Sequence, residues 1–172
     1  MLALGLALQL MRSHVEHDPA AASLLAEAQT ELQHSLRELR ELARGIHPAI
    51  LTDQGLASAA RTLASRAPIP VTVSSTEKRF PPAVETAAYF VIAEALTNIA
   101  KYASASKASI TIGRDNGYAR IDVHDDGIGG ADPAKGSGLA GLADRIGALD
   151  GRLTISSDAR AGTRITAQIP CA

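Results

Sequence analysis

The chain has few of the residues that stabilise secreted proteins or bind nucleic acids. Its 172 residues include no tryptophan, one cysteine and only 3% aromatic residues, and the net charge is −1. Because Cys171 has no partner for an internal disulfide and no Cys/His spacing is typical of zinc, we expect a reducing, cytoplasmic setting. The shortage of aromatic side chains predicts an aliphatic core without base-stacking platforms. With so little net charge, no direct nucleic acid binding is expected.

The chain also lacks a typical signal peptide or membrane span. Residues 1–11 are apolar, but no basic region precedes them, no cleavage site follows, and they are too short to cross a bilayer. Leu4, Leu8, Met11 and Val15 recur instead at helical spacing. This region is therefore predicted to form one helix of a packed pair, with no membrane segment.

The second helix of that pair has a start signal and a heptad repeat. Asp18-Pro19 is typical of an N-cap followed by proline at the first helical position. Apolar residues then follow at every seventh position: Leu25, Leu32, Leu39 and Ile46. So wide an apolar stripe predicts a homodimer in which residues 1–47 form a four-helix bundle. The alternative is that the stripe packs on the rest of the same chain.

The remainder of the chain predicts an α+β fold. Asn116-Gly117 between two β-branched runs is typical of a tight hairpin turn, and Pro81-Pro82 is typical of a helix start. Helices are expected at residues 51–66, capped near Thr52 or Asp53, and at 82–103 and 139–149. Strands are expected at 70–74, 108–113, 119–123, 153–156 and 163–169. This order predicts a two-layer sandwich, with helices on one face of a mixed sheet.

Three polar residues on the helix at 82–103 are candidates for phosphate chemistry. Glu94, Asn98 and Lys101 are spaced so that one helix face carries all three. The Asn98 amide oxygen is a suitable Mg²⁺ ligand, Lys101 can neutralise phosphate charge, and Glu94 can act as a base or hold a metal-bound water. A solvated polar face is the simpler interpretation of the trio taken alone.

Two glycine-rich segments follow that are suited to an adenine ring and a polyphosphate. Asp126 can accept a hydrogen bond from the adenine amino group, and Gly127 and Gly129 allow close approach of the backbone; Asp125 is expected to point to the other side of the strand. Gly136-Ser137-Gly138 precedes a helix, whose first N–H groups can receive phosphate oxygens. Taken singly, a turn-forming acid and a helix cap explain these residues equally well.

In this order the motifs resemble the ATPase superfamily of gyrase, MutL and histidine kinases. Glu94-x-x-x-Asn98 resembles its N box, the segment from Asp126 to Gly130 its first glycine box, and Gly136-x-Gly-Leu-x-Gly141 its second. The resemblance implies a Bergerat-type ATP-binding domain that uses ATP and Mg²⁺, with Asn98 as the metal ligand and Glu94, Asn98 and Lys101 as catalytic residues. It implies the following nucleotide-binding residues: Asn98, Lys101, Tyr102, Asp126, Gly127, Gly129, Gly130, Gly136, Ser137, Gly138, Leu139, Gly141 and Thr163.

Other segments resemble one subfamily, the sensor histidine kinases paired with LuxR-type (NarL-like) response regulators. The matching segments are Gly141-Leu-Ala-Asp-Arg145-Ile, Ala148-Leu-Asp-Gly151, Gly162-Thr163, Ile169-Pro170 and the run from Leu39 to Leu51 with the following Gly55-Leu56. The resemblance implies a partial dimerisation hairpin at 1–47 with a truncated first helix, a linker helix at 48–66 and an ATP-binding catalytic domain at 67–172. A LuxR-type response regulator is the implied partner, and Tyr102 stands where many members have histidine.

The family's phosphoacceptor motif, His-Asp-x-x-x-Gln, does not occur in this sequence. None of the five histidines has that context, so we expect a fragment or truncated product that binds ATP without phosphorylating itself. The expected function of the parent is transfer of the ATP γ-phosphate to a histidine and then to a response-regulator aspartate. Two alternatives are a dimeric nucleotide-gated interaction module without phosphotransfer and a serine kinase of the anti-sigma type.

Overall fold

A computed structural model describes residues 48–76, 78–131, 137–158 and 161–171. The predictions made for residues 1–47, including the helical hairpin and the homodimer, lie outside the described residues, as does Gly136. Pro48–Ala172 form one compact unit, so the segments assigned in the sequence to a linker helix and an ATP-binding domain belong to the same unit.

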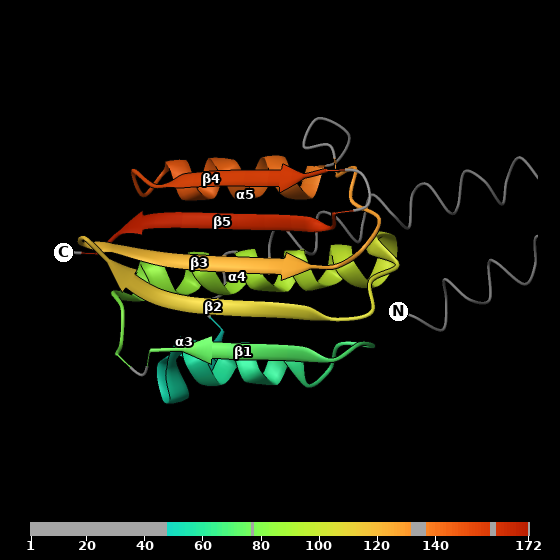
Figure 1. The fold of residues 1–172 in the computed structure, drawn as a ribbon. Helices are drawn as coiled ribbons and strands as arrows, with labels where there is room; N and C mark the ends of the chain where they lie inside the picture. The colour runs from blue at the N-terminus through green and yellow to red at the C-terminus, as the bar shows by residue number, and fades with distance from the viewer. Residues whose placement is uncertain (1–47, 77, 132–136, 159–160, 172) are drawn as a thin grey trace, which may run out of the picture. The chain divides into compact units, whose positions relative to one another are not determined.

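A mixed five-stranded sheet forms one layer of the unit, and helices cover one of its faces (Figure 1). The strands are β1 (Val71–Ser75), β2 (Ala108–Asp115), β3 (Tyr118–Asp125), β4 (Arg152–Ser157) and β5 (Thr163–Pro170), in the spatial order β1-β2-β3-β5-β4. β1 runs parallel to β2, and all other neighbours are antiparallel. The predicted two-layer α+β architecture is confirmed.

The β2–β3 hairpin closes at the predicted turn. Asn116 and Gly117 both have positive φ, 49° and 83°, and Asp115 pairs with Tyr118 on either side of them. Two consecutive left-handed residues are the conformation that matches the twist of a two-residue hairpin, and Asn-Gly adopts it at little cost. The turn fixes the register of β3, and through β3 it fixes the place of the acidic residues at the end of that strand.

The described residues of the unit also form three helices and a π-turn: α3 (Ala49–Ala64), α4 (Pro82–Asn98), η1 (Ile99–Ala103) and α5 (Ser137–Gly147). The helix expected at 82–103 is continuous, but its last five residues are π-helical. The segment Pro82–Ala103 is long and apolar enough to span a membrane by length and composition alone. In this structure it is the central core helix, with Ala88, Val91 and Ile92 fully buried.

α3 departs from its prediction at both the cap and the interior. It begins at Ala49 rather than residue 51, and no side chain caps its first turn, so the expected caps Thr52 and Asp53 were wrong. The N–H of Leu51 donates to the carbonyl of Pro48 at 2.9 Å, which starts the helix earlier. Gly55, at φ 76° and ψ 177°, then interrupts it.

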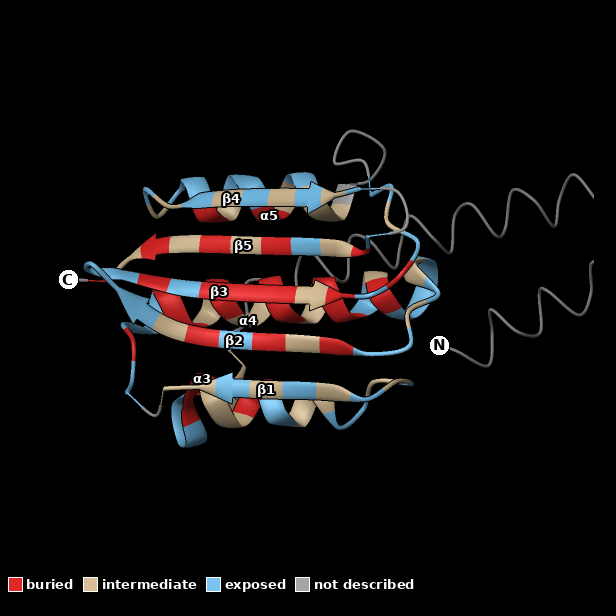
Figure 2. Ribbon diagram, viewed as in Figure 1, coloured by how far each residue is buried: buried red, intermediate tan, exposed pale blue. Residues whose placement is uncertain are grey.

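The core lies between the sheet and the helices and is aliphatic, as predicted. Figure 2 shows buried residues concentrated on β2, β3, β5 and on α4. Alternate strand residues such as Ile110, Ile121 and Ile169 face the helices and are fully buried. Phe80 is the one aromatic residue in the buried core of the described chain. The strand alternation therefore determines which side chains can reach a site between the sheet and the helices.

Candidate functional site

The two acids at the end of β3 lie in different environments. Ala119, Ile121 and Val123 are buried against the helices, and Asp125 continues this alternation with 3% of its surface exposed. Its Oδ1 accepts a hydrogen bond from the N–H of Gly127 at 2.8 Å. A buried, hydrogen-bonded carboxylate facing the helix layer can contact a ligand held between the two layers.

Asp126 instead fastens a neighbouring loop. One carboxylate oxygen accepts hydrogen bonds from the backbone N–H groups of Ser106 and Lys107, at 2.8 and 3.0 Å, and the other accepts from the Ser106 hydroxyl at 2.6 Å. Asp126 is exposed. The sequence predicted that Asp126 contacts adenine and that Asp125 points to the other side of the strand. The structure places Asp125, and not Asp126, on the face that the helices cover.

Two signals in the sequence point to Asp125. The apolar residues Ala119, Ile121 and Val123 alternate along the strand, so continuing from Val123 by two residues reaches Asp125. The spacing Asp125-x-Gly127-x-Gly129 also starts from the buried acid, whereas counting from Asp126 loses the regular glycine spacing. A shift of one residue along a strand moves a side chain to the opposite face.

The environment of Asp126 predicts a specific acid sensitivity. The hydrogen bonds from Ser106 and the Lys107 N–H lower the pKa of Asp126 from 3.8 to about 2. A folded-state pKa below the unfolded value means that the stabilisation is present above about pH 4 and disappears as the pH falls towards about 2. We expect Asp126→Asn to lower the free energy of unfolding at pH 6, with the deficit shrinking between about pH 4 and pH 2. Urea unfolding across pH 2–6 measures this.

Ser106→Ala is the matched variant for that measurement, because it removes the largest cause of the shift and leaves the carboxylate. Without that hydrogen bond the pKa of Asp126 is expected to lie closer to its ordinary value. The free energy of unfolding of Ser106→Ala should therefore change over a narrower pH range than that of the wild type. An Asp126→Asn protein that keeps the full wild-type pH dependence between pH 2 and pH 4 would contradict the assignment.

Three glycines allow distant segments to meet at Asp125. A Cβ atom at Gly127 would collide with the carbonyl oxygen of Ala103, at the end of η1. At Gly129 it would collide with the Asp158 carbonyl oxygen, and at Gly162 with that of Asp125; both glycines have positive φ, 66° and 77°. The end of η1, the loop after β3 and the segment before β5 are therefore packed backbone to backbone. Gly130 also has positive φ, but its Cβ position is open.

Thr163 belongs to the same cluster through the sheet. The β3–β5 register pairs His124 with Arg164, so one further step sets Asp125 opposite Thr163 on the helix-facing side. The Thr163 and Ser157 hydroxyls lie 2.8 Å apart. The side chain of Thr163 is thus anchored next to the buried carboxylate.

The polar residues of α4 and η1 do not form the simple stripe that was expected. Glu94 and Asn98 are half-buried, whereas Lys101 and Tyr102 are exposed, Tyr102 by 69%. Lys101 lies in η1, where the wider turn changes the angle between it and Asn98 from that of an α-helix. π-turns of this kind recur at functional sites. Glu94 and Asn98 keep the one-turn spacing that the sequence predicted.

Glu94 connects α4 with the start of α5. A Cβ atom at Gly138 would collide with the Glu94 carboxylate, although Gly138 itself needs no positive φ. Gly138 therefore provides room for Glu94 beside the first turn of α5. Of the other residues predicted in this segment, Ser137 begins α5, Leu139 packs on the core and Gly141 lies within the helix.

The donors on α4 are compatible with a magnesium ion that is held mainly by a phosphate ligand. The described residues contain no group of three His, Cys, Asp or Glu side chains that could hold a metal by themselves. Mg²⁺ commonly keeps several waters and takes one or two protein oxygens together with phosphate oxygens. An amide oxygen at Asn98, with the Glu94 carboxylate one turn away, fits that donor set.

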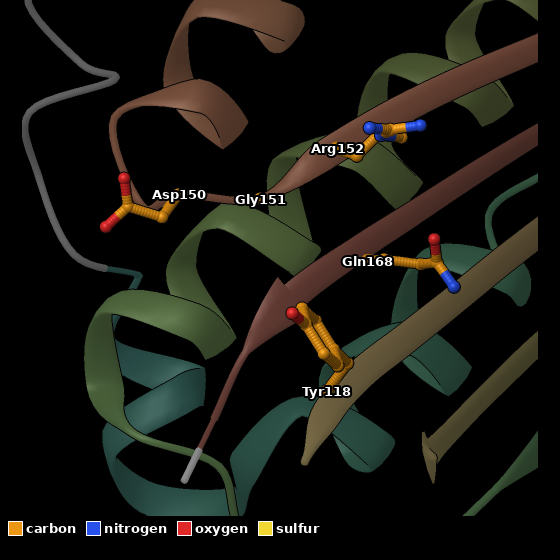
Figure 3. Close-up of a pocket in the computed structure, with 5 residues that line it drawn as sticks. All are labelled: Tyr118, Asp150, Gly151, Arg152 and Gln168. Atoms are coloured by element: carbon orange, nitrogen blue, oxygen red, sulfur yellow. The ribbon is translucent and has the colours of Figure 1, made fainter. Parts of the chain in front are cut away.

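A hollow in the surface lies away from these residues. It has a volume of about 340 Å³ and is lined by Tyr118, Asp150, Gly151, Arg152 and Gln168 (Figure 3). The Asp150 carboxylate and the Arg152 guanidinium point in different directions. Tyr118 begins β3 and Asp125 ends it, which separates the hollow from Asp125 by about 23 Å at the usual strand rise. We do not assign the nucleotide to this hollow.

This chain is similar to known proteins in both sequence and fold. Residues 83–172 match the family of histidine kinase-, DNA gyrase B-, and HSP90-like ATPases. The sensor histidine kinase MctS of Rhizobium johnstonii is 31% identical over 98% of this chain and 38% of its own length. The sensor histidine kinase NarS of Mycobacterium tuberculosis is 31% identical over 81% of this chain and 35% of its own length. The chain thus spans less than half of these relatives.

A solved structure extends the comparison to the fold. The histidine kinase domain of a blue-light activated histidine kinase from Erythrobacter litoralis EL346 matches with a TM-score of 0.60 and 18% identity, covering 98% of this chain and 94% of that one. At this identity the likeness concerns the fold alone. Together with the matched residues and the sensor-kinase relatives, it shows that this chain belongs to the histidine kinase-, DNA gyrase B-, and HSP90-like ATPase family and carries the ATPase core of a sensor histidine kinase.

Proposed function

We propose that this chain is the ATP-binding catalytic core of a two-component sensor histidine kinase and positions the γ-phosphate of ATP for transfer to a histidine. The observation that carries the proposal is the buried carboxylate of Asp125, which lies on the helix-covered side of the sheet where η1, the β3 loop and β5 converge. A buried acceptor at that place suits the exocyclic amino group of adenine. Thr163 lies beside it and can fix a second contact to the base, directly or through water.

The phosphates are proposed to extend from Asp125 towards Glu94, Asn98 and the start of α5. The first-turn N–H groups of α5 suit an anionic group, and Gly138 lets the Glu94 carboxylate lie beside that turn. Asn98 would hold Mg²⁺, which neutralises charge on the phosphate oxygens when bound. Glu94 is proposed as the base or water-positioning residue. The exposed side chains of Lys101 and Tyr102 are proposed to contact the phosphates only when the nucleotide is bound.

For the parent protein we propose onward transfer of the phosphate to an aspartate of a response regulator with a LuxR-type DNA-binding domain. The subfamily resemblance from Gly141 to Gly151 and before Pro48 supports this partner. We further propose a homodimer through residues 1–47 and a cytoplasmic location for this part of the parent. The isolated chain is expected to bind ATP without phosphorylating itself.

The separate roles proposed for Asn98 in metal binding and for Glu94 in phosphate transfer provide the test of this function. Asn98→Asp is expected to weaken Mg²⁺-dependent ATP binding by about tenfold or more, because the amide that can orient to the ion is replaced by a group that repels the phosphates. Glu94→Gln is expected to retain ATP binding and to lower phosphate transfer to a supplied acceptor helix by roughly 100-fold. Calorimetry and transfer of labelled phosphate measure the two effects.

The exposed Thr97, between these two residues, provides the control, since Thr97→Ala removes only a hydroxyl that bonds the Ala93 carbonyl within the helix. ATP binding that is equally strong with and without Mg²⁺ would argue against the metal role of Asn98. Transfer to serine in place of histidine on the supplied helix would favour the anti-sigma type of kinase. Nucleotide binding without transfer to any acceptor would favour the gated interaction module.

A further inference from the structure

The break in α3 lies next to an ion pair between an exposed arginine and a buried carboxylate. Gly55 interrupts the helix with φ 76° and ψ 177°, so residues 49–54 form a short helical segment of their own. Leu51 is fully buried within that segment. A helix this short has little intrinsic stability and needs tertiary contacts to hold its place.

Arg79 supplies those contacts from the loop before α4. Its guanidinium donates to the carbonyl oxygen of Leu51 at 2.7 Å and makes two hydrogen bonds to the Glu85 carboxylate, at 2.8 and 2.9 Å. Glu85 also accepts the N–H of Phe80 at 3.1 Å. The Glu85 side chain is only 1% exposed, whereas that of Arg79 is 56% exposed. The arginine thus joins the short helix to a carboxylate buried in α4.

Gly55 fits this arrangement for two separate reasons. Its positive φ is unfavourable for any residue with a side chain. A Cβ atom there would also lie 3.0 Å from both Cδ and Nε of Arg79, close enough to press on the guanidinium stem. The helix break and the path of Arg79 therefore depend on each other.

The ion pair lies between the linker segment at residues 48–54 and α4, the helix that carries the proposed phosphate-site residues. Glu85 lies in the first turn of α4, and the same helix carries Glu94 and Asn98 further along. Residues 48–54 lead directly to the segment before Pro48. Arg79, which contacts both the Leu51 carbonyl and the buried Glu85 carboxylate, is well placed to fix the linker segment relative to the site-bearing helix.

We propose that Arg79 and Glu85 form a clamp that holds residues 48–54 on α4 and so couples the ATP-binding unit to the chain that precedes it. The clamp positions the unit and takes no part in nucleotide contact. Because the coupling to phosphate transfer rests on the proposed function, the clamp itself must be tested by a measurement that does not need ATP.

Amide hydrogen exchange on the full chain makes that measurement. The double variant Arg79→Ala/Glu85→Gln removes both charges and keeps an acceptor for the Phe80 N–H, so it avoids stranding a buried carboxylate. We expect exchange at residues 49–56 to accelerate by about tenfold or more while β2, β3 and β5 keep their protection. ATP affinity is expected to stay within about threefold of wild type, and transfer to a supplied acceptor helix to fall by about tenfold.

Two further variants separate a clamp from general support of the fold. Gly55→Ala is expected to accelerate exchange in the same segment without changing any charge. Arg120→Ala/Asp122→Asn removes a comparable ion pair, 2.7 Å long, from the uncovered face of the sheet and is expected to leave residues 49–56 and transfer unchanged.

Unchanged exchange at residues 49–56 in the double variant, acceleration spread over the whole unit, or full transfer with the segment released would each overturn the proposal. A wild-type chain that binds no ATP would refute the proposed function, while the exchange experiment would still decide whether the clamp exists.

Discussion

Asp125→Asn is expected to weaken ATP binding by roughly 100-fold or more, whereas Asp126→Asn is expected to change it by no more than about threefold. The carboxylate at 125 is buried on the helix side and receives the Gly127 N–H, so an amide there would place a donor against the donor of the adenine amino group. Asp126 is exposed and engaged with Ser106 and Lys107. Isothermal titration calorimetry with ATP measures both affinities.

The two aspartates are adjacent in sequence and differ by one carboxylate-to-amide change, so each variant is the control for the other. Thermal unfolding of both proteins must accompany the titration, because each carboxylate also makes local hydrogen bonds. If both proteins are folded but Asp126→Asn loses ATP binding while Asp125→Asn retains it, Asp126 and not Asp125 would be the residue that contacts adenine.

Gly162→Ala is expected to destabilise the unit by about 3 kcal/mol and to reduce ATP binding by at least tenfold in the protein that remains folded. The residue has φ 77°, and an added Cβ atom would collide with the Asp125 carbonyl oxygen and lie 2.8 Å from its carbonyl carbon. Since neither contact is with a flexible side chain, relief requires the backbone beside Asp125 to move. Urea unfolding and calorimetry give the two effects.

Gly113→Ala is the matched control for that substitution. Gly113 lies in β2, has no positive φ, and its Cβ position has no heavy atom within 4 Å. It is expected to be neutral or slightly stabilising, because alanine restricts the unfolded chain more than glycine does. If Gly162→Ala were as stable as Gly113→Ala and bound ATP normally, the backbone contact would not shape the site.

Local signals in the sequence were sufficient for most of the fold. The Asn116-Gly117 turn and the Pro81-Pro82 helix start each depend on the conformation of a few adjacent residues, and both appear where expected. The helix break at Gly55 could not be predicted in this way. It is stabilised by Arg79, 24 positions later, whose contact with Leu51 depends on tertiary packing. The π-turn at Ile99–Ala103 likewise has no local glycine or proline to mark it.

The sequence motifs of the candidate site could be predicted, but the positions of their side chains relative to one another could not. The prediction placed the adenine contact one residue too late, at Asp126, whereas strand alternation continued from Val123 reaches Asp125. The neighbourhood of Thr163 and Asp125 depends on β5 lying between β3 and β4, an order that sequence adjacency does not predict. The contact between Glu94 and Gly138 depends on how α5 packs on α4, which likewise follows only from the assembled fold.

The most direct test of the central claim, an adenine site at the Asp125 end of β3, is a comparison of ATP with GTP by calorimetry on the wild-type chain in the presence of Mg²⁺. A carboxylate acceptor facing the base selects the amino group of adenine and repels the carbonyl oxygen of guanine. We expect ATP to bind at least about 100-fold more tightly than GTP, and this preference to disappear in Asp125→Asn. Equal affinity of the wild-type chain for the two nucleotides, or a preference that survives Asp125→Asn, would contradict the account.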